Sequence, residues 1–170
     1  YIIVYKMKKN YNKWDFRFLA NAKLIASYSK DRTKIGSVLV KDKRILTSGY
    51  NGFPSLIEDT EERLINRAIK LKYTIHAEMN SILHAGKHGI NLQDSTCYIY
   101  GLTPCQECAK HIVVSGIKKV VYTIRSNHKN SPEWEEQFNF VKELFKESSI
   151  ELIEYSDSSL SEFIKKETEL

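Results

Sequence analysis

Apolar side chains recur at a helical period near the start of the chain and then give way to two β-like runs. Residues 14–28 have apolar positions three and four apart, which predicts an amphipathic helix. Residues 34–40 and 44–50 are predicted to form two strands joined by a tight turn at 41–43. A loop follows at 51–54, where a glycine and a proline end the regular pattern.

The rest of the chain alternates between helical and strand patterns. Residues 58–72 are polar and helix-prone, which predicts a surface segment, and residues 76–85 predict a helix that Gly86 ends. Further strands are expected at 96–100, 119–122 and 150–155, and further helices at 105–115 and 132–147. Strands that alternate with helices pair in parallel through right-handed crossovers. The pattern therefore predicts an α/β protein with a three-layer α/β/α fold, in which helices cover both faces of a mixed five-stranded sheet.

One domain is expected, because 170 residues suffice for a single core and no linker rich in Pro, Gly or Ser divides the chain. We place this domain at 14–156, after an N-terminal extension at 1–13 and before a C-terminal tail at 157–170. Within the tail, residues 160–166 are either a short helix or a frayed end.

Composition narrows the class of ligand. The chain is 42% hydrophobic and 28% charged, as in ordinary globular proteins, and no apolar run approaches the length of a membrane span. Its formal net charge of +5 suits anionic ligands, either free nucleotides or nucleic acid. The lysines are scattered rather than gathered into a stripe, so net charge favours nucleic acid only weakly. Three cysteines are too few for a disulfide framework, and we expect a reducing, cytoplasmic location.

Two short runs carry side chains that can do chemistry: His-Ala-Glu at 76–78 and Pro-Cys-Gln-Glu-Cys at 104–108. Each is predicted to open a helix, where residues three apart point to one side. The positive end of the helix dipole also lowers the pKa of a thiol, which favours the thiolates that bind zinc. His76, Cys105 and Cys108 are therefore predicted to bind one Zn²⁺ and to leave its fourth position to water. The order H-x-E…P-C-x-x-C is the signature of zinc-dependent deaminases.

The position of Glu78 suits a proton carrier. It lies two residues beyond His76, so its carboxylate can stand beside the metal without binding it. In deamination, Glu78 would accept a proton from the zinc-activated water and deliver it to the ring nitrogen, and the amine would leave as ammonia. The backbone N–H of Ala77, at the same helix start, is placed to bond the base carbonyl. Glu78 is the predicted catalytic residue.

With these motifs the sequence resembles the zinc-dependent cytidine and deoxycytidylate deaminase superfamily and, within it, the deoxycytidylate (dCMP) deaminases. The resemblance runs from about residue 14 to residue 155. Besides the zinc signature, it rests on segments at 29–31, 49–54, 61–63, 72–73, 108–110 and 115–122. The most specific is the Gly-Tyr-Asn-Gly-x-Pro loop at 49–54, which is typical of dCMP deaminases and not of nucleoside or tRNA deaminases.

The resemblance implies the substrate site. Asn51 should bond the sugar hydroxyl, although an Asn-Gly pair is also a common turn. Cationic candidates for the phosphate are Lys30, Arg32, Lys34, Arg63 and Arg67, with Tyr73 or Tyr122 as helpers. The resemblance also implies that the product is dUMP for thymidylate synthesis. It further implies a homo-oligomer, a hexamer as in many dCMP deaminases, with dCTP and dTTP as effectors.

Some phage members of the family carry a second, structural zinc on His and Cys residues between the Asn-Gly loop and the zinc histidine. Residues 53–75 contain neither residue type, so one zinc per chain is expected. The remaining histidines are predicted to lie on the surface or in packing contacts, and Cys97 in a buried strand. These histidines are His84, His88, His111 and His128.

Other functions fit parts of the pattern. The enzyme could act on cytidine, on dCTP or on adenosine in tRNA, and a zinc-bound protein without turnover would keep the ligands. Glu78 counts against the last reading, because a structural zinc needs no carboxylate beside an open coordination position. A Cys-x-x-Cys oxidoreductase would give no role to His76 and Glu78.

Overall fold

A mixed sheet lies at the centre of the computed structural model, which describes residues 6–7, 12–126 and 132–168. The sheet has six strands in the order β1-β6-β5-β4-β2-β3. β2 (Gly36–Lys41) and β3 (Arg44–Tyr50) form the expected hairpin. β2 then pairs antiparallel with β4 (Thr96–Gly101). From there β5 (Lys119–Ile124) and β6 (Glu151–Glu154) continue the sheet in parallel.

The sixth strand was not expected. β1 (Lys6–Met7) pairs in parallel with β6, within the segment assigned to an N-terminal extension. A strand of two residues is too short to display the alternation that identifies strands in a sequence. The five longer strands are the five that the alternating pattern predicts.

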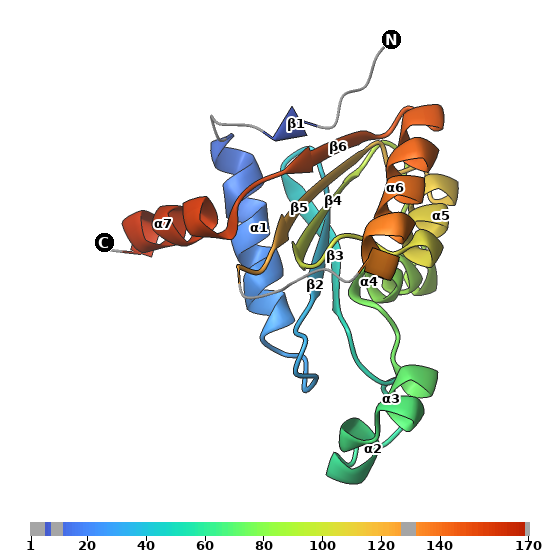
Figure 1. Cartoon of the computed structure of the whole chain (residues 1–170). Helices are drawn as coiled ribbons and strands as arrows, with labels where there is room; N and C mark the ends of the chain where they lie inside the picture. Colours follow the sequence, from blue (N-terminus) through green and yellow to red (C-terminus); the bar gives the residue numbers. More distant parts are fainter. Residues whose placement is uncertain (1–5, 8–11, 127–131, 169–170) are drawn as a thin grey trace.

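Helices cover both faces of this sheet, as expected (Figure 1). One face carries α1 (Lys13–Ala26) and α7 (Asp157–Thr168). The other carries α4 (Ala77–Lys87), α5 (Gln106–Val114) and α6 (Pro132–Glu147). Alternate strand residues point to opposite faces, so that Tyr98 and Val121 join the first core while Ile99 and Tyr122 join the second.

The C-terminal helix extends beyond its predicted bounds. α7 covers 157–168 rather than 160–166, and its Leu160 and Phe163 are buried against α1. The ring of Phe163 meets that of Phe16 edge to face at a centroid distance of 5.4 Å. Because these side chains join the core, the helix is packed and not a frayed end.

The polar segment expected at 58–72 is divided into α2 (Glu61–Ile65) and α3 (Arg67–Tyr73). Asn66 separates them: its extended backbone ends α2, and its side chain accepts a hydrogen bond from Ile69 N at the start of α3. Neither helix has a buried residue, and both stand apart from the sheet in Figure 1. Within the described part of the chain, no helix is long and apolar enough to cross a membrane.

Candidate active site

The three predicted metal ligands meet where two helices begin. His76 is the N-cap of α4, and Cys105 is the N-cap of α5, with its sulfur accepting from Cys108 N at 3.5 Å. The sulfurs of Cys105 and Cys108 lie 3.4 Å and 3.5 Å from His76 Nδ1. The three ligand atoms all lie within 4.8 Å of one another.

These distances fit zinc. In a tetrahedral site with Zn–S of about 2.3 Å and Zn–N of about 2.0 Å, a sulfur and a nitrogen ligand stand about 3.5 Å apart. Two thiolates and one imidazole are also the donor types that zinc prefers, and three protein ligands leave a position for water. The residues present therefore fit a catalytic zinc ion.

The pKa values of the three candidate ligands show which protons a bound metal would displace. The hydrogen bond with the Cys108 thiol lowers the pKa of Cys105 to about 4, and the same contact raises the pKa of Cys108. The hydrogen bond to the Cys105 sulfur raises the pKa of His76 to about 9. Zinc requires two thiolates and a neutral imidazole, so binding would release protons from this cluster.

Glu78 is buried beside the ligands, with 3% of its surface exposed. Burial raises the pKa of its carboxyl to about 7. A cation held by the neighbouring ligands would lower that pKa again, because it favours the charged form. A carboxyl beside a metal site can act as a general base and then as a general acid.

Close packing fixes the start of α4 against the hairpin. A Cβ on Gly49 of β3 would come within 2.5 Å of Ser81 N and 2.6 Å of Ala77 O, so only glycine fits there. Ser81 Oγ donates to the Glu78 carbonyl oxygen at 2.8 Å and lies 3.0 Å from Ser37 Oγ of β2. The first turn of α4 thus rests directly on β2 and β3, which determines where Glu78 enters the site.

A cavity of about 230 Å³ opens next to these groups. Its wall includes His76, Glu78 and Cys105. Three other regions complete the wall. The first is the loop before β2 together with Asn51, and the second is helix α3 together with Thr74, which follows it. The third is the segment before α5 together with one side chain of α6. These wall residues are Asp31, Thr33, Ile35, Asn51, Arg67, Lys70, Leu71, Thr74, Leu102, Thr103 and Trp134.

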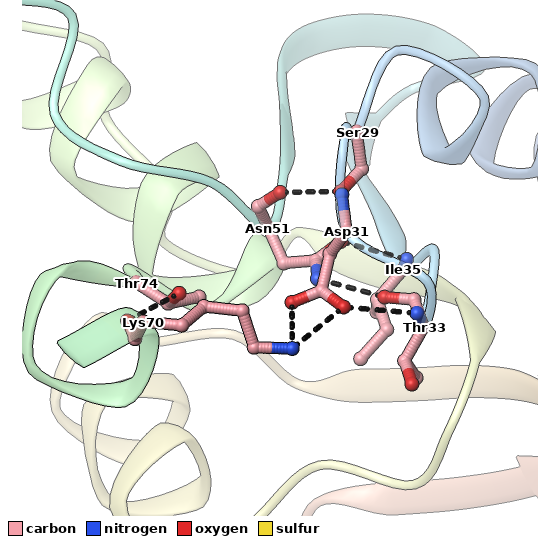
Figure 2. Close-up of polar contacts among 7 residues, drawn as sticks. All are labelled: Ser29, Asp31, Thr33, Ile35, Asn51, Lys70 and Thr74. Atoms are coloured by element: carbon pink, nitrogen blue, oxygen red, sulfur yellow. Dashed lines mark hydrogen bonds and ion pairs between the residues drawn. The ribbon is translucent and has the colours of Figure 1, made fainter. Parts of the chain in front are cut away.

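Asn51 lies in this wall and also holds the loop in front of β2 (Figure 2). Its Oδ1 accepts from Ile35 N at 2.8 Å, and its Nδ2 donates to Thr33 O at 2.8 Å. Its carbonyl oxygen accepts from Ser29 Oγ at 2.7 Å. Asn51 therefore lines the cavity, and each of its amide atoms retains capacity for one further hydrogen bond. The alternative that Asn51 and Gly52 form only a turn with positive φ does not hold, because neither residue has a positive φ and Gly52 pairs with Ile75 in an antiparallel bridge.

An ion pair crosses the wall between two segments that are far apart in sequence. Lys70 Nζ of α3 lies 2.9 Å from Asp31 Oδ2 and 3.0 Å from Asp31 Oδ1. Asp31 Oδ1 also accepts from Thr33 N at 3.0 Å, as Figure 2 shows. Only 19% of the Lys70 side chain and 9% of the Asp31 side chain are exposed. Sequence reasoning missed Lys70, since nothing in its local pattern distinguishes it from the other lysines of a polar helix.

The residues predicted to bind the phosphate lie in different parts of the structure. Arg67 lines the cavity, whereas Arg32 is exposed and outside its wall. Lys34 Nζ donates to Ser29 O. Tyr122 is fully buried in the core, where its hydroxyl donates to Glu154 Oε2 at 3.0 Å. Tyr122 therefore does not reach the cavity, because its strand turns this side chain into the layer between sheet and helices.

The other basic candidates lie away from the cavity wall. Lys30 pairs with Asp59 at 2.8 Å, and Arg63 donates to Glu58 O at 2.7 Å with its guanidinium over the Tyr73 ring. The histidines that were not assigned to zinc, where described, are exposed: His84, His88 and His111. His128 lies outside the described residues. Cys97 is fully buried in β4.

Fold and site together define a class. A three-layer α/β/α domain that presents His-x-Glu at one helix start and Pro-Cys-x-x-Cys at the next is that of a zinc-dependent deaminase. Residues 12–124 match the family described as the cytidine and deoxycytidylate deaminase zinc-binding region, and the chain belongs to this family of hydrolytic enzymes.

Relatives span most of the chain. The chain is 33% identical over 142 residues to an uncharacterized deaminase in the luxG 3′ region of Aliivibrio fischeri. This alignment covers 83% of this chain and 92% of that protein. It is also 33% identical over 132 residues to human deoxycytidylate deaminase, covering 72% of this chain and 71% of that protein.

Solved structures share the fold. A dCMP deaminase from the cyanophage S-TIM5, crystallised in complex with dCMP and dUMP, superposes with a TM-score of 0.64 at 24% identity. That superposition covers 88% of this chain and 99% of the phage chain. At this level of identity the likeness concerns the fold alone.

Proposed function

We propose that the chain catalyses the hydrolytic deamination of dCMP to dUMP and ammonia and so supplies dUMP for thymidylate synthesis. One observation carries the proposal: a single cavity is lined by two of the candidate zinc ligands, by Glu78 and by two cationic side chains of α3. The ligands are His76 and Cys105, and the cations are Arg67 and Lys70. Similarity to human deoxycytidylate deaminase supports the same substrate.

The chemistry follows from the groups at the catalytic end of the cavity. A zinc ion on His76, Cys105 and Cys108 would supply a water of lowered pKa. Glu78 takes one proton of the attacking water and delivers it to the ring nitrogen, while the water oxygen bonds to the ring carbon that carries the amine. Glu78 then passes the second water proton to the amine, the carbon–nitrogen bond breaks, and the amine departs as ammonia. The backbone N–H of Ala77, the first residue of α4, donates to the base carbonyl. Water and dCMP are consumed, and dUMP and ammonia are formed.

Asn51 is the proposed contact for the sugar. Its amide is held in one orientation by Ile35 N and Thr33 O, so the remaining hydrogen-bonding capacity points in a fixed direction. A polar group fixed in advance binds a hydroxyl without the entropic cost of ordering its side chain.

For the phosphate, the cavity favours Arg67 and Lys70 over Arg32 and Lys34, which do not line it. Asp31 holds the Lys70 ammonium in the wall and neutralises it in the absence of an anion. A phosphate dianion would accept charge-assisted hydrogen bonds from Lys70, and Arg67 could make two such bonds. The cations of α3 would then select a monophosphate over a nucleoside.

The decisive experiment measures ammonia release from dCMP, deoxycytidine, cytidine, dCTP and a tRNA adenosine substrate. We expect a preference for dCMP over deoxycytidine of at least about a hundredfold in kcat/KM, from two phosphate contacts of about 2 kcal/mol each. Equal turnover of deoxycytidine or cytidine would remove the monophosphate proposal and leave a deaminase of another substrate. No turnover of any of them by the zinc-loaded protein would favour a zinc-bound binding protein.

A matched pair of lysines on α3 tests the phosphate contact. Lys70→Ala should lower kcat/KM for dCMP by about thirtyfold, the equivalent of about 2 kcal/mol, and should leave deoxycytidine nearly unaffected. Lys72→Ala is the control, since Lys72 is exposed on the same helix and outside the cavity wall. A similar loss in both variants would mean that general charge, and not a contact of Lys70, attracts the substrate.

Assembly and regulation are further proposals that rest on resemblance. We propose a homo-oligomer with six subunits, with dCTP and dTTP as effectors. Light scattering at micromolar concentration measures the first, and monomers would contradict it. Deamination rates with and without dCTP or dTTP measure the second.

A further inference from the structure

One aromatic side chain of the cavity wall is not accounted for by metal, proton transfer, sugar or phosphate. Trp134, in the first turn of α6, lines the cavity together with His76, Glu78 and Cys105. Its indole Nε1 donates to Thr103 Oγ1 at 2.7 Å. Thr103 is 2% exposed and also lines the cavity.

This contact places the indole at the catalytic end of the cavity. Thr103 precedes the metal ligand Cys105 by two residues, so their Cα atoms are at most about 7 Å apart. The carbon that loses its amine must lie beside the metal, and the base that carries it therefore lies within reach of Trp134. Because Nε1 is the only donor of an indole, its bond to Thr103 also restricts the orientation of the ring.

The other tryptophan of the chain lies in a different setting. Trp14, on α1 at the opposite face of the sheet, stacks on Phe18 at a centroid distance of 5.8 Å. Arg17 and Lys43 place their charged groups 4.9 Å and 5.0 Å from the centre of its ring. Trp14 is thus a surface packing residue, whereas Trp134 lines the cavity.

We propose that Trp134 is a specificity-determining residue that forms an aromatic wall for the pyrimidine ring, and that Thr103 is the positioning residue that orients it. The inference rests on the proposed function and adds the contact that recognises the planar base. Stacking of a base on an aromatic side chain changes affinity by roughly five- to 150-fold in other nucleotide-binding proteins. Its contribution is made to the base and is therefore independent of the phosphate.

Kinetics separate this contact from the others. Trp134→Ala should raise KM by about tenfold or more for dCMP and for deoxycytidine alike, with a smaller change in kcat, and Trp134→Phe should restore most of the loss. Lys70→Ala, in contrast, should affect dCMP alone. Thr103→Val should raise KM in the same way as Trp134→Ala, and Thr103→Ser should retain a low KM.

Fluorescence gives a readout that does not depend on turnover. In the zinc-loaded Trp14→Phe protein all tryptophan emission comes from Trp134, and titration with dUMP should change it saturably. In Trp134→Phe, where only Trp14 emits, dUMP should leave the emission unchanged.

The two proposals fail differently. If the wild-type protein released no ammonia from dCMP, the proposed function would fall, whereas a saturable change of Trp134 emission with cytidine would still support the wall. If dCMP were deaminated but Trp134→Ala kept the wild-type KM, and dUMP at inhibitory concentration left the Trp14→Phe emission flat, the wall would be overturned and the function would stand.

Discussion

Two carboxylates occupy equivalent places on opposite faces of the sheet and have different surroundings. Asp15 lies in the first turn of α1, and Glu78 lies in the first turn of α4. Each is almost fully buried, with 2% and 3% of its surface exposed. Burial of a carboxylate is costly unless hydrogen bonds and opposite charge compensate for it, and the two sites differ in where compensation comes from.

The cost of burying the Asp15 carboxylate is offset by hydrogen bonds and an ion pair within the protein. Its Oδ1 accepts from the Tyr98 hydroxyl at 2.9 Å, and its Oδ2 from the Tyr155 hydroxyl at 3.1 Å. Lys119 Nζ lies 3.2 Å and 3.3 Å from the two oxygens. These partners lie on β4, on β5 and directly after β6. Asp15 therefore ties α1 to the sheet.

Glu78 instead faces a cavity, and its neighbours are the candidate ligands of a metal. Burial raises the pKa of Glu78 to about 7, so in the metal-free protein much of its charge is suppressed near neutral pH. Metal and substrate would complete its surroundings. The comparison teaches that burial alone does not distinguish a structural from a catalytic carboxylate: the source of the compensating charge does.

Removal of a metal ligand should have the largest effect. Cys105→Ala should abolish zinc binding and deamination, and should lower the melting temperature, because the metal joins the starts of α4 and α5. Metal analysis, ammonia release and thermal unfolding measure these changes. Cys97→Ala is the control: it removes a buried thiol that is not in the ligand set and should retain zinc. Full zinc occupancy in Cys105→Ala would contradict the assignment.

Asp15→Asn should act on stability and not on chemistry. Loss of the charge leaves Lys119 without its partner and weakens two buried hydroxyl contacts, which should lower the free energy of unfolding by about 2–4 kcal/mol. We expect kcat/KM to stay within about twofold of wild type below the melting transition. Urea unfolding and ammonia release test this, with Asp42→Asn in the exposed hairpin turn as control. A large loss of kcat in folded Asp15→Asn would contradict the assignment of Asp15 to a structural rather than a chemical role.

Glu78→Gln should have the opposite effect on the stability of metal-free protein. The folded-state pKa of Glu78 is about 7, above its ordinary value of 4.5, so between these values the folded state holds a proton that the unfolded state has lost. The contribution of Glu78 to stability therefore falls as pH rises through this window. At pH 8 in the presence of a chelator, Glu78→Gln should be more stable than wild type by about 1–3 kcal/mol, and near pH 4 the gain should vanish. A pH-independent difference would show that Glu78 does not titrate in this range.

The smallest expected effect concerns one hydroxyl of the Asp15 site. Tyr98→Phe removes a single hydrogen bond to a charged acceptor and should lower the free energy of unfolding by about 1–2 kcal/mol. Tyr28→Phe, at a side chain that is 56% exposed, is the control and should be nearly neutral. Equal effects in the two variants would mean that the hydroxyl of Tyr98 adds nothing to the compensation of Asp15.

Local patterns predicted most of the fold. The helix at 132–147 has the predicted bounds, because its apolar period is regular and Pro132 marks its start. The hairpin and the parallel strands follow in the expected order. β1 was not predicted, because its two residues form a strand only by pairing with β6, and no local sequence pattern indicates that contact.

The site was predictable where residues adjacent in sequence act together. Cys105 and Cys108 lie three apart at the start of one helix, so helical geometry brings their sulfurs together. His76 lies 29 residues before Cys105 and was identified because the two motifs together form a known signature, while the tertiary fold brings it to the cysteines. Lys70 and Asp31 are 39 residues apart, and Trp134 and Thr103 are 31 apart, so only the tertiary fold joins them. Tyr122 was assigned to the substrate site by resemblance, although the alternation of its strand directs it into the core.

The central claim is that the buried carboxyl at the start of α4 transfers protons in a hydrolytic deamination. It is tested most directly by ammonia release from dCMP, measured side by side for zinc-loaded wild type and Glu78→Gln with the zinc content of both determined. We expect one zinc per chain in each protein and a kcat about a thousandfold lower in the variant. A variant that keeps a tenth of wild-type turnover at equal zinc content would contradict the role of Glu78.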